Sequence, residues 1–226
     1  KKIQAVLGSF VPVLVFIDER YQTIREEIKQ EPDKDESKYL ELFVDFAYEN
    51  EDIVQINRDD TTEPKVIDSK GILKHIRKLN RSTSKYIQLI EEVGHDNQRT
   101  IKKREKIIQI VMEVRIAPKM FEILQKIATS YMNEIKRHEK EIRIMVVEEA
   151  GITMEEFLKS FVNKESDISW IEKYIRAKRK YSSTLNKNKQ KILAAQRRLG
   201  KLEKSSYKTI QQIKALNRKL NMGKIQ

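Results

Sequence analysis

Basic side chains near the end of the sequence are the residues that most plainly suggest a chemistry. Residues 174–226 hold 16 Lys/Arg against the single Glu203, a net charge of +15. Cationic side chains neutralise backbone phosphates, which gives salt-sensitive affinity for nucleic acid without reading its sequence. A solvated basic face or an acidic protein partner would fit the same composition. Ten of the 16 are our candidates for neutralising phosphates: Arg176, Lys178, Arg179, Lys180, Lys187, Lys189, Lys191, Arg197, Arg198 and Lys201.

A second possible chemistry is metal-dependent hydrolysis. The side chains that could hold a divalent metal are His75, His95, Asp96 and Asp167. Imidazole and carboxylate groups of this kind ligate metals in helical phosphohydrolases. However, His95 and Asp96 follow Gly94 at the end of a predicted helix, where polar turn residues are ordinary. We therefore predict no metal site.

Other catalytic arrangements are missing from the sequence. It contains no Cys, which excludes disulfides, thiolate zinc sites and cysteine nucleophiles. His138 and Glu139 begin like a zinc protease motif, but Ile142 stands where the second His is required. On its helix His138 falls on the apolar face, which favours a hydrogen-bonded core histidine. We predict a protein without enzymatic activity, catalytic residues, cofactors or a small-molecule substrate.

Composition and hydrophobic spacing predict an all-α protein. Only 6 Gly and 4 Pro punctuate 226 residues, so long helices are expected and turn-rich β folds are not. The apolar run at 5–17 is interpreted as part of a buried first helix rather than a signal peptide. The helical period predicts an irregular multi-helix bundle with a long central helix; the helices cover about 12–31, 69–93, 97–115 and 118–150.

Charge divides the predicted single domain, residues 1–226, into three parts. Residues 12–48 form N-terminal helices, and 69–226 form the helical bundle. Between them, residues 49–68 lack a helical pattern and are interpreted as an acidic, mobile linker or insertion in which no strand is expected. The surrounding stretch 31–68 holds 13 Asp/Glu against 4 Lys/Arg, a net charge of −9.

Short helices are expected at three further places. Apolar residues from Tyr39 to Ala47 repeat at helical spacing after Ser37. Thr153 with Glu156 forms the pattern of a capping box. Asp167 and Ser169 could together begin another helix that carries Trp170 and Tyr174. These helices would lie at an angle to the long ones.

The C-terminal part is predicted to be a basic helical hairpin. Its first helix covers about 182–203 and has heptad-like apolar spacing that Asn188 interrupts. A turn near Ser205 and Ser206 would lead into an antiparallel helix with apolar residues from Tyr207 to Leu220.

Three motifs resemble the non-conserved region of primary sigma factors of bacterial RNA polymerase, which lies between conserved regions one and two. Arg115-Ile-Ala-Pro-Lys-Met-Phe-Glu-Ile-Leu124 is similar to an Arg-x-x-Pro-Lys-x-Phe-x-x-Leu pattern that opens a long helix in that family. Ser166-Asp-Ile-Ser-Trp170 is the second motif. Ile210-Gln-Gln-Ile-Lys-Ala-Leu-Asn-Arg-Lys-Leu-Asn-Met-Gly223 resembles the approach to region two. The resemblance covers about residues 97–223.

The resemblance implies a cytoplasmic sigma subunit that directs RNA polymerase to promoters in transcription initiation. It also implies that this segment docks on core RNA polymerase, chiefly on the β′ subunit, lies near promoter DNA and modulates promoter escape. Promoter DNA would be bound through the full-length protein, and no membrane is involved. The chain begins with Lys, so we expect it to be a segment of a longer protein. The alternatives are a free-standing basic helical nucleic-acid-binding protein and a helical scaffold or adaptor.

Six arginines are our sequence-based candidates for contacts with nucleic acid or with an acidic partner. Two lie on the first predicted helix and four near the basic end. They are Arg20, Arg25, Arg176, Arg179, Arg197 and Arg198.

Overall fold

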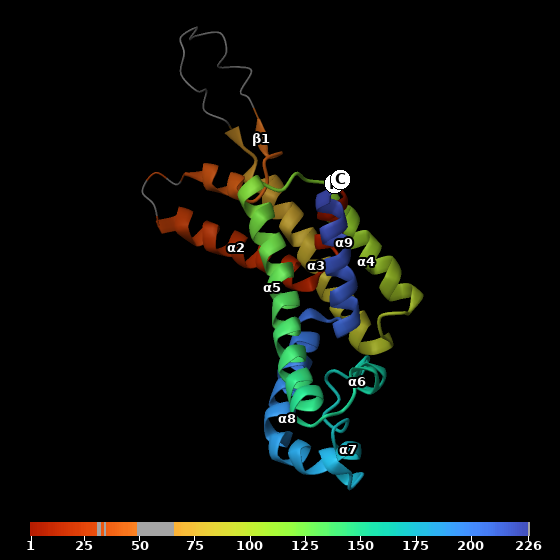
Figure 1. Cartoon of the computed structure of the whole chain (residues 1–226). Helices are drawn as coiled ribbons and strands as arrows, with labels where there is room; N and C mark the ends of the chain where they lie inside the picture. Colours follow the sequence, from red (N-terminus) through yellow and green to blue (C-terminus); the bar gives the residue numbers. More distant parts are fainter. Residues whose placement is uncertain (31–32, 34, 49–65, 226) are drawn as a thin grey trace, which may run out of the picture. The chain divides into compact units, whose positions relative to one another are not determined.

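The structure, a computed structural model, describes residues 1–30, 33, 35–48 and 66–225. Helices dominate these residues, which confirms the all-α prediction (Figure 1). The chain divides into two compact units, residues 1–128 and 129–226. The single domain over 1–226 stays a prediction. Most of the acidic linker predicted at 49–68 lies outside the described residues.

The first unit begins with two helices, α1 (Lys2–Leu7) and α2 (Val11–Gln30). The apolar run at 5–17, predicted to belong to one helix, is therefore divided. Gly8 marks the break, and a Cβ added there would lie 3.1 Å from Cβ of Val111. The close approach explains the glycine, since α1 packs against the helix that carries Val111. The stripe predicted for α2 is buried: Leu14, Ile17, Tyr21, Ile24 and Ile28.

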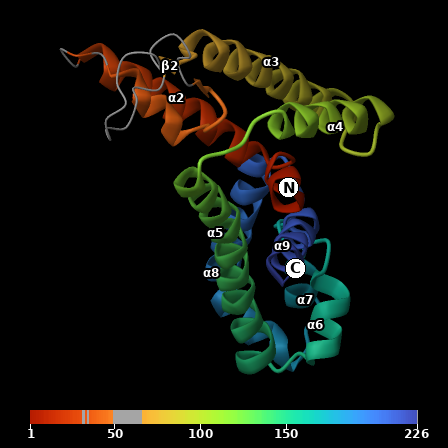
Figure 2. The same cartoon turned by 90° about the horizontal axis from the view of Figure 1, so that it is seen from above.

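Two longer helices, α3 (Ser69–Val93) and α4 (Gln98–Met112), lie side by side in the same unit (Figure 2). The side chain of Asp68 caps α3 by accepting a 2.7 Å hydrogen bond from the Gly71 N–H. Gly94, with φ 81°, ends α3, and Asn97 caps α4. The apolar sides of both helices are buried, which packs the pair together: Ile72, Ile76, Leu79, Tyr86, Ile107 and Ile110.

Residues between α2 and α3 differ from the prediction. The helix expected from Tyr39 to Ala47 is a short 3-10 helix, η1 (Glu36–Glu41), and Asp35 caps it. The chain then becomes extended, because Phe43 bridges to Ile116.

A small antiparallel ladder pairs β1 (Ala47–Tyr48) with β2 (Val66–Ile67). The second strand lies within residues 49–68, so the expectation of no strand there is wrong at its last residues. Each strand has two residues only, and the fold class is unaffected.

The boundary between the two units falls within the long helix α5 (Pro118–Arg143). Helical structure continues through the π-helical turn η2 (Ile144–Glu149), which agrees with the predicted extent of 118–150. The second unit then holds α6 (Met154–Phe161), α7 (Glu172–Arg176), α8 (Lys180–Ser206) and α9 (Ile210–Ile225).

Aromatic side chains join α6 to the turn before α7. Trp170 is 2% exposed and packs against Phe157 and Phe161, with ring centroids 6.0 and 4.9 Å away. Thr153 caps α6 as predicted. Asp167 accepts hydrogen bonds from Ser169, but α7 starts only at Glu172, so this pair shapes a turn instead of capping a helix.

The two basic helices α8 and α9 are joined through Tyr207, which has a left-handed backbone with φ 53°. Their apolar stripes are buried close to the predicted positions: Leu185, Ile192, Leu199, Ile210, Ile213, Leu216 and Leu220. The antiparallel pairing of this hairpin stays a prediction. In the part of the chain that is described, no helix has the length and apolar character needed to span a membrane.

Candidate nucleic-acid interface

Arg20 and Arg25, the candidates of the first unit, have different environments on α2. The guanidinium of Arg20 lies 3.3 Å from Glu27 and 2.6 Å from Glu41, and its hydrogen bond to Glu41 raises its pKa. Arg25 is exposed. Arg20 is therefore already neutralised by carboxylates, which leaves Arg25 as the better candidate for an external anion.

The other four arginines belong to the second unit. Arg176 is 81% exposed and lies 3.9 Å from Glu172 at the end of α7. Arg179 precedes α8, and its backbone N–H donates to Ser182 Oγ. Arg197 and Arg198 are exposed neighbours on α8, so they point about 100° apart around the helix. These side chains do not form one compact cluster.

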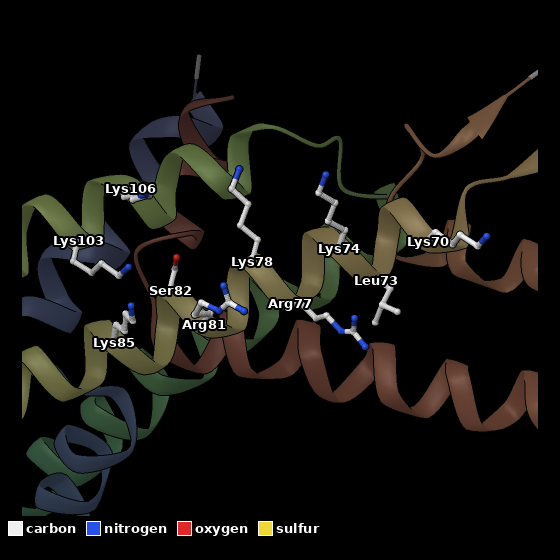
Figure 3. A pocket seen from close by; sticks show the side chains of 10 residues that line it. All are labelled: Lys70, Leu73, Lys74, Arg77, Lys78, Arg81, Ser82, Lys85, Lys103 and Lys106. Atoms are coloured by element: carbon white, nitrogen blue, oxygen red, sulfur yellow. The ribbon is translucent and has the colours of Figure 1, made fainter.

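The described residues contain a more concentrated basic surface, which we call the α3–α4 groove (Figure 3). It has a volume of about 700 Å³. Eight of its ten lining residues are cationic, and the other two are Leu73 and Ser82. Figure 3 shows Lys85 of α3 and Lys103 of α4 pointing toward one another. The cationic residues are Lys70, Lys74, Arg77, Lys78, Arg81, Lys85, Lys103 and Lys106.

Carboxylates neutralise little of this groove. Lys78 lies 2.6 Å from Glu113, and no other ion pair of these eight cations occurs within the described ranges. Burial lowers the pKa of Lys103, and the nearby charges of Lys106 and Lys85 lower it further. The groove is therefore a place where positive charges repel one another, and an anion would relieve that repulsion.

A short stretch of the sequence indicates this groove by its excess of basic residues. The excess is lost when charges are summed over a longer segment. Residues 69–90 hold six Lys/Arg and no Asp or Glu. The six recur at intervals of one, three or four residues, which places most of them along the solvent side of α3. Acidic residues beyond Leu89 reduce the total when the sum extends over a longer segment, so the excess of α3 is missed.

The second unit has an exposed apolar surface, the α6 ridge, formed by Met154, Leu158 and Val162. Their exposed fractions are 38%, 50% and 43%. They recur every four residues and so share one side of α6 and its C-terminal cap. Leu158 and Val162 also line a cavity of about 350 Å³ that includes Lys136, Lys140 and Arg143.

The same cavity contains an ion pair. Glu139 of α5 lies 2.5 Å from the Nζ atom of Lys214 of α9, and both side chains are less than a quarter exposed. Burial raises the pKa of Glu139, while Lys214 opposes that effect. The pair fixes α9 against α5 beside the α6 ridge, and its charges are already balanced.

Comparison with known proteins identifies the chain. Residues 13–203 match the family model described as the sigma-70 non-essential region.

The chain belongs to the sigma-70 non-essential region family.

A related protein is RNA polymerase sigma factor RpoD of Neisseria gonorrhoeae, which is 23% identical over 149 residues. The match covers 66% of this chain and 23% of that protein, so it spans about a quarter of the relative's length. The sigma-70 match confirms the predicted resemblance and extends it toward the N-terminus, from about residue 97 to residue 13. It identifies the chain as a sigma-factor segment and not an enzyme.

Two of the three motifs make hydrogen bonds to residues distant in sequence. Arg115 precedes α5, and its N–H donates a 2.6 Å hydrogen bond to Asp45. In the motif 166–170, Ser166 donates to Glu203 of α8, and the carbonyl of Asp167 accepts from Gln196. The first contact joins two non-helical segments, and the contacts of the second motif position a turn against α8. The third motif, 210–223, forms most of α9 and lies beyond the matched range.

Two of the three histidines of the sigma-70 segment are buried. His138 is 1% exposed, and its Nδ1 atom lies 2.9 Å from Glu141, which confirms the predicted core histidine. His75 is buried against Phe43 and Phe46. Among the residues with described positions, no group of three or more His, Asp or Glu is arranged to hold a metal.

Proposed function

We propose that this chain is the non-conserved segment of a primary sigma factor and acts in transcription initiation by docking on core RNA polymerase. The sigma-70 family match over residues 13–203 is the observation that carries the proposal. We assign the docking to the β′ subunit, place the protein in the cytoplasm, and expect it to lie near promoter DNA and modulate promoter escape.

The α6 ridge is the surface that we assign to docking. Three neighbouring exposed apolar side chains on one side of a helix are unusual in a chain in which 35% of the residues are charged. Lys136, Lys140 and Arg143 lie beside them, so the matching partner surface presents apolar side chains next to carboxylates. Apolar burial would supply affinity, and the charges would orient the partner.

The exposed arginines are assigned a weaker, electrostatic role. Arg25, Arg176, Arg179, Arg197 and Arg198 would attract DNA phosphates or acidic polymerase surface, with an effect that falls as salt is added. Arg20 is expected to contribute least, because Glu27 and Glu41 already neutralise it.

The docking proposal is tested by capturing the tagged chain and measuring its binding to purified core RNA polymerase, and separately to isolated β′, over a salt series. Binding to β′ that weakens with salt is the expected result. No binding to either one at low salt would overturn independent docking.

A pair of variants tests the assigned surface. Leu158→Asp with Val162→Asp places two charges on the α6 ridge, and we expect at least a tenfold loss of affinity because apolar contact is replaced by desolvated carboxylate. Met222→Asp with Val93→Asp is the matched control, since it adds the same charge at side chains that are 61% and 39% exposed and do not belong to the ridge. Equal losses in both variants would contradict the assignment.

A further inference from the structure

We propose that the α3–α4 groove binds the backbone phosphates of duplex DNA. The proposed function expects the chain to lie near promoter DNA, and this inference extends it by naming a surface that meets the DNA. The six arginines predicted from the sequence do not include any residue of this groove.

Most cations of the groove lack a carboxylate partner among the described residues. Seven of its eight cations have no ion-pair partner among the described residues, and Glu113 pairs with the remaining one, Lys78. Concentrating positive charge in this way destabilises a protein unless an anion is bound. A ligand with several regularly placed negative charges therefore fits better than a single small anion.

The cations of the groove extend along more than half of α3. Lys70 and Lys85 lie 15 residues apart on α3, which corresponds to about 22 Å along the helix. Duplex DNA presents one phosphate per roughly 3.4 Å of axis along each strand. Because each strand winds around that axis, a straight row of this length meets phosphates of both strands rather than consecutive phosphates of one. Five cations of α3 without ion-pair partners among the described residues are spread over that distance.

The other lining residues favour a duplex over single strands and peptides. Sites for single-stranded nucleic acid use aromatic side chains on which bases stack. The groove's lining residues, all of them described, include no aromatic side chain, and Leu73 is the single apolar one. An acidic amphipathic helix would find one apolar side chain there, Leu73, for the several anchors of its apolar face. Recognition by the groove is thus through phosphates and independent of base sequence.

The experiment measures binding of the whole 226-residue chain to a fluorescent 20-base-pair DNA duplex by anisotropy over a salt series, without polymerase. The groove variant replaces three exposed side chains: Lys74→Gln, Arg81→Gln and Lys85→Gln. The matched control on α8 removes the same charge from exposed positions: Lys187→Gln, Lys191→Gln and Lys201→Gln.

We expect the groove variant to bind DNA on the order of a hundredfold more weakly at 0.1 M salt and to reduce the slope of log K against log salt by about three. The control is expected to change that slope by less than one. Equal effects of both triple variants would overturn the proposal, because net charge alone would then explain the binding. Tighter binding to single-stranded DNA or to duplex RNA than to duplex DNA would also overturn it.

Circular dichroism checks that the groove variant is folded. If it is not, the single variant Lys103→Gln on α4 gives an independent reading, with an expected slope reduction of about one. Because polymerase is absent from this experiment, failure here leaves β′ docking untouched, and failure of β′ docking leaves the groove untouched.

Discussion

The α3–α4 groove and the basic end of the chain carry similar charge in different ways. Residues 174–226 have the larger excess, +15, but several of their cations already meet carboxylates. Lys189 lies 2.6 Å from Glu172, and Lys214 lies 2.5 Å from Glu139. In the groove, seven cations without ion-pair partners among the described residues face one volume of about 700 Å³. The comparison teaches that the total charge of a segment does not reveal where its charges converge without carboxylate partners.

The largest expected effect comes from weakening the packing that holds the groove's two helices together. Leu79→Ala removes a side chain that is 1% exposed, and we expect a loss of about 2–5 kcal/mol in the free energy of unfolding. Arg197→Ala on α8 should change it by no more than about 0.5 kcal/mol. Urea unfolding followed by circular dichroism measures both, and a loss for Leu79→Ala no greater than about 0.5 kcal/mol would contradict the expected role of α3 packing.

Reversing one charge within the groove should have the next largest effect. Lys103→Glu would create a partner for Lys85 and Lys106, so we expect DNA affinity to fall at least tenfold and the salt slope to decrease by about two. Lys191→Glu on α8 is the comparison, with a slope change below one. If Lys191→Glu has the larger effect, the basic end and not the groove dominates DNA binding.

A titration can detect the repulsion between groove lysines directly. Lys85→Gln removes one of the charges that lower the pKa of Lys103, so that pKa should rise toward its ordinary value. Bound duplex DNA should raise it in the unmodified chain. NMR of the Lys103 side chain follows both changes, and an unchanged pKa in both cases would show that the groove charges do not interact.

The smallest expected effect concerns His75, a buried residue of α3 that packs against Phe43 and Phe46. Burial lowers its pKa, Glu113 opposes this shift, and Lys78 adds to it. Since the folded-state pKa lies below the unfolded value of 6.5, unfolding takes up a proton, and stability should fall as the pH drops through that value. His75→Phe should make the unfolding free energy less dependent on pH in this window. A pH dependence equal to that of the unmodified chain would show that His75 is not the group responsible for it.

Much of the fold followed from the sequence because helical periodicity and end signals agree. Gly94, Asn97 and Pro118 stand at helix ends in the structure, and the apolar stripe of α2 is buried as predicted. Predictions were wrong where tertiary contacts decide the backbone. Ser37 does not begin a helix that reaches Ala47, because the chain near Phe43 pairs with Ile116 instead.

The candidate site was less predictable than the fold. Local composition points to the arginines, but it contains no information about partners distant in sequence. Arg20 is neutralised by Glu41, 21 residues away, and Lys103 reaches the groove through packing of α4 on α3. The number of acidic residues at helical spacing around each basic residue would have indicated α3, where residues 69–90 contain none.

The turn that joins the walls of the groove depends on an achiral residue. Gly94 has φ 81° and ψ 176°, and beyond its chain neighbours no atom lies within 4 Å of the position a Cβ would take. These angles are strained for any L-amino acid, but their mirror image is ordinary extended backbone. D-alanine at this position would fit the native turn while restricting the unfolded chain, with an expected gain of about 0.4–1 kcal/mol. The connection between α3 and α4 thus depends on backbone handedness at one residue, while apolar packing holds the two helices together.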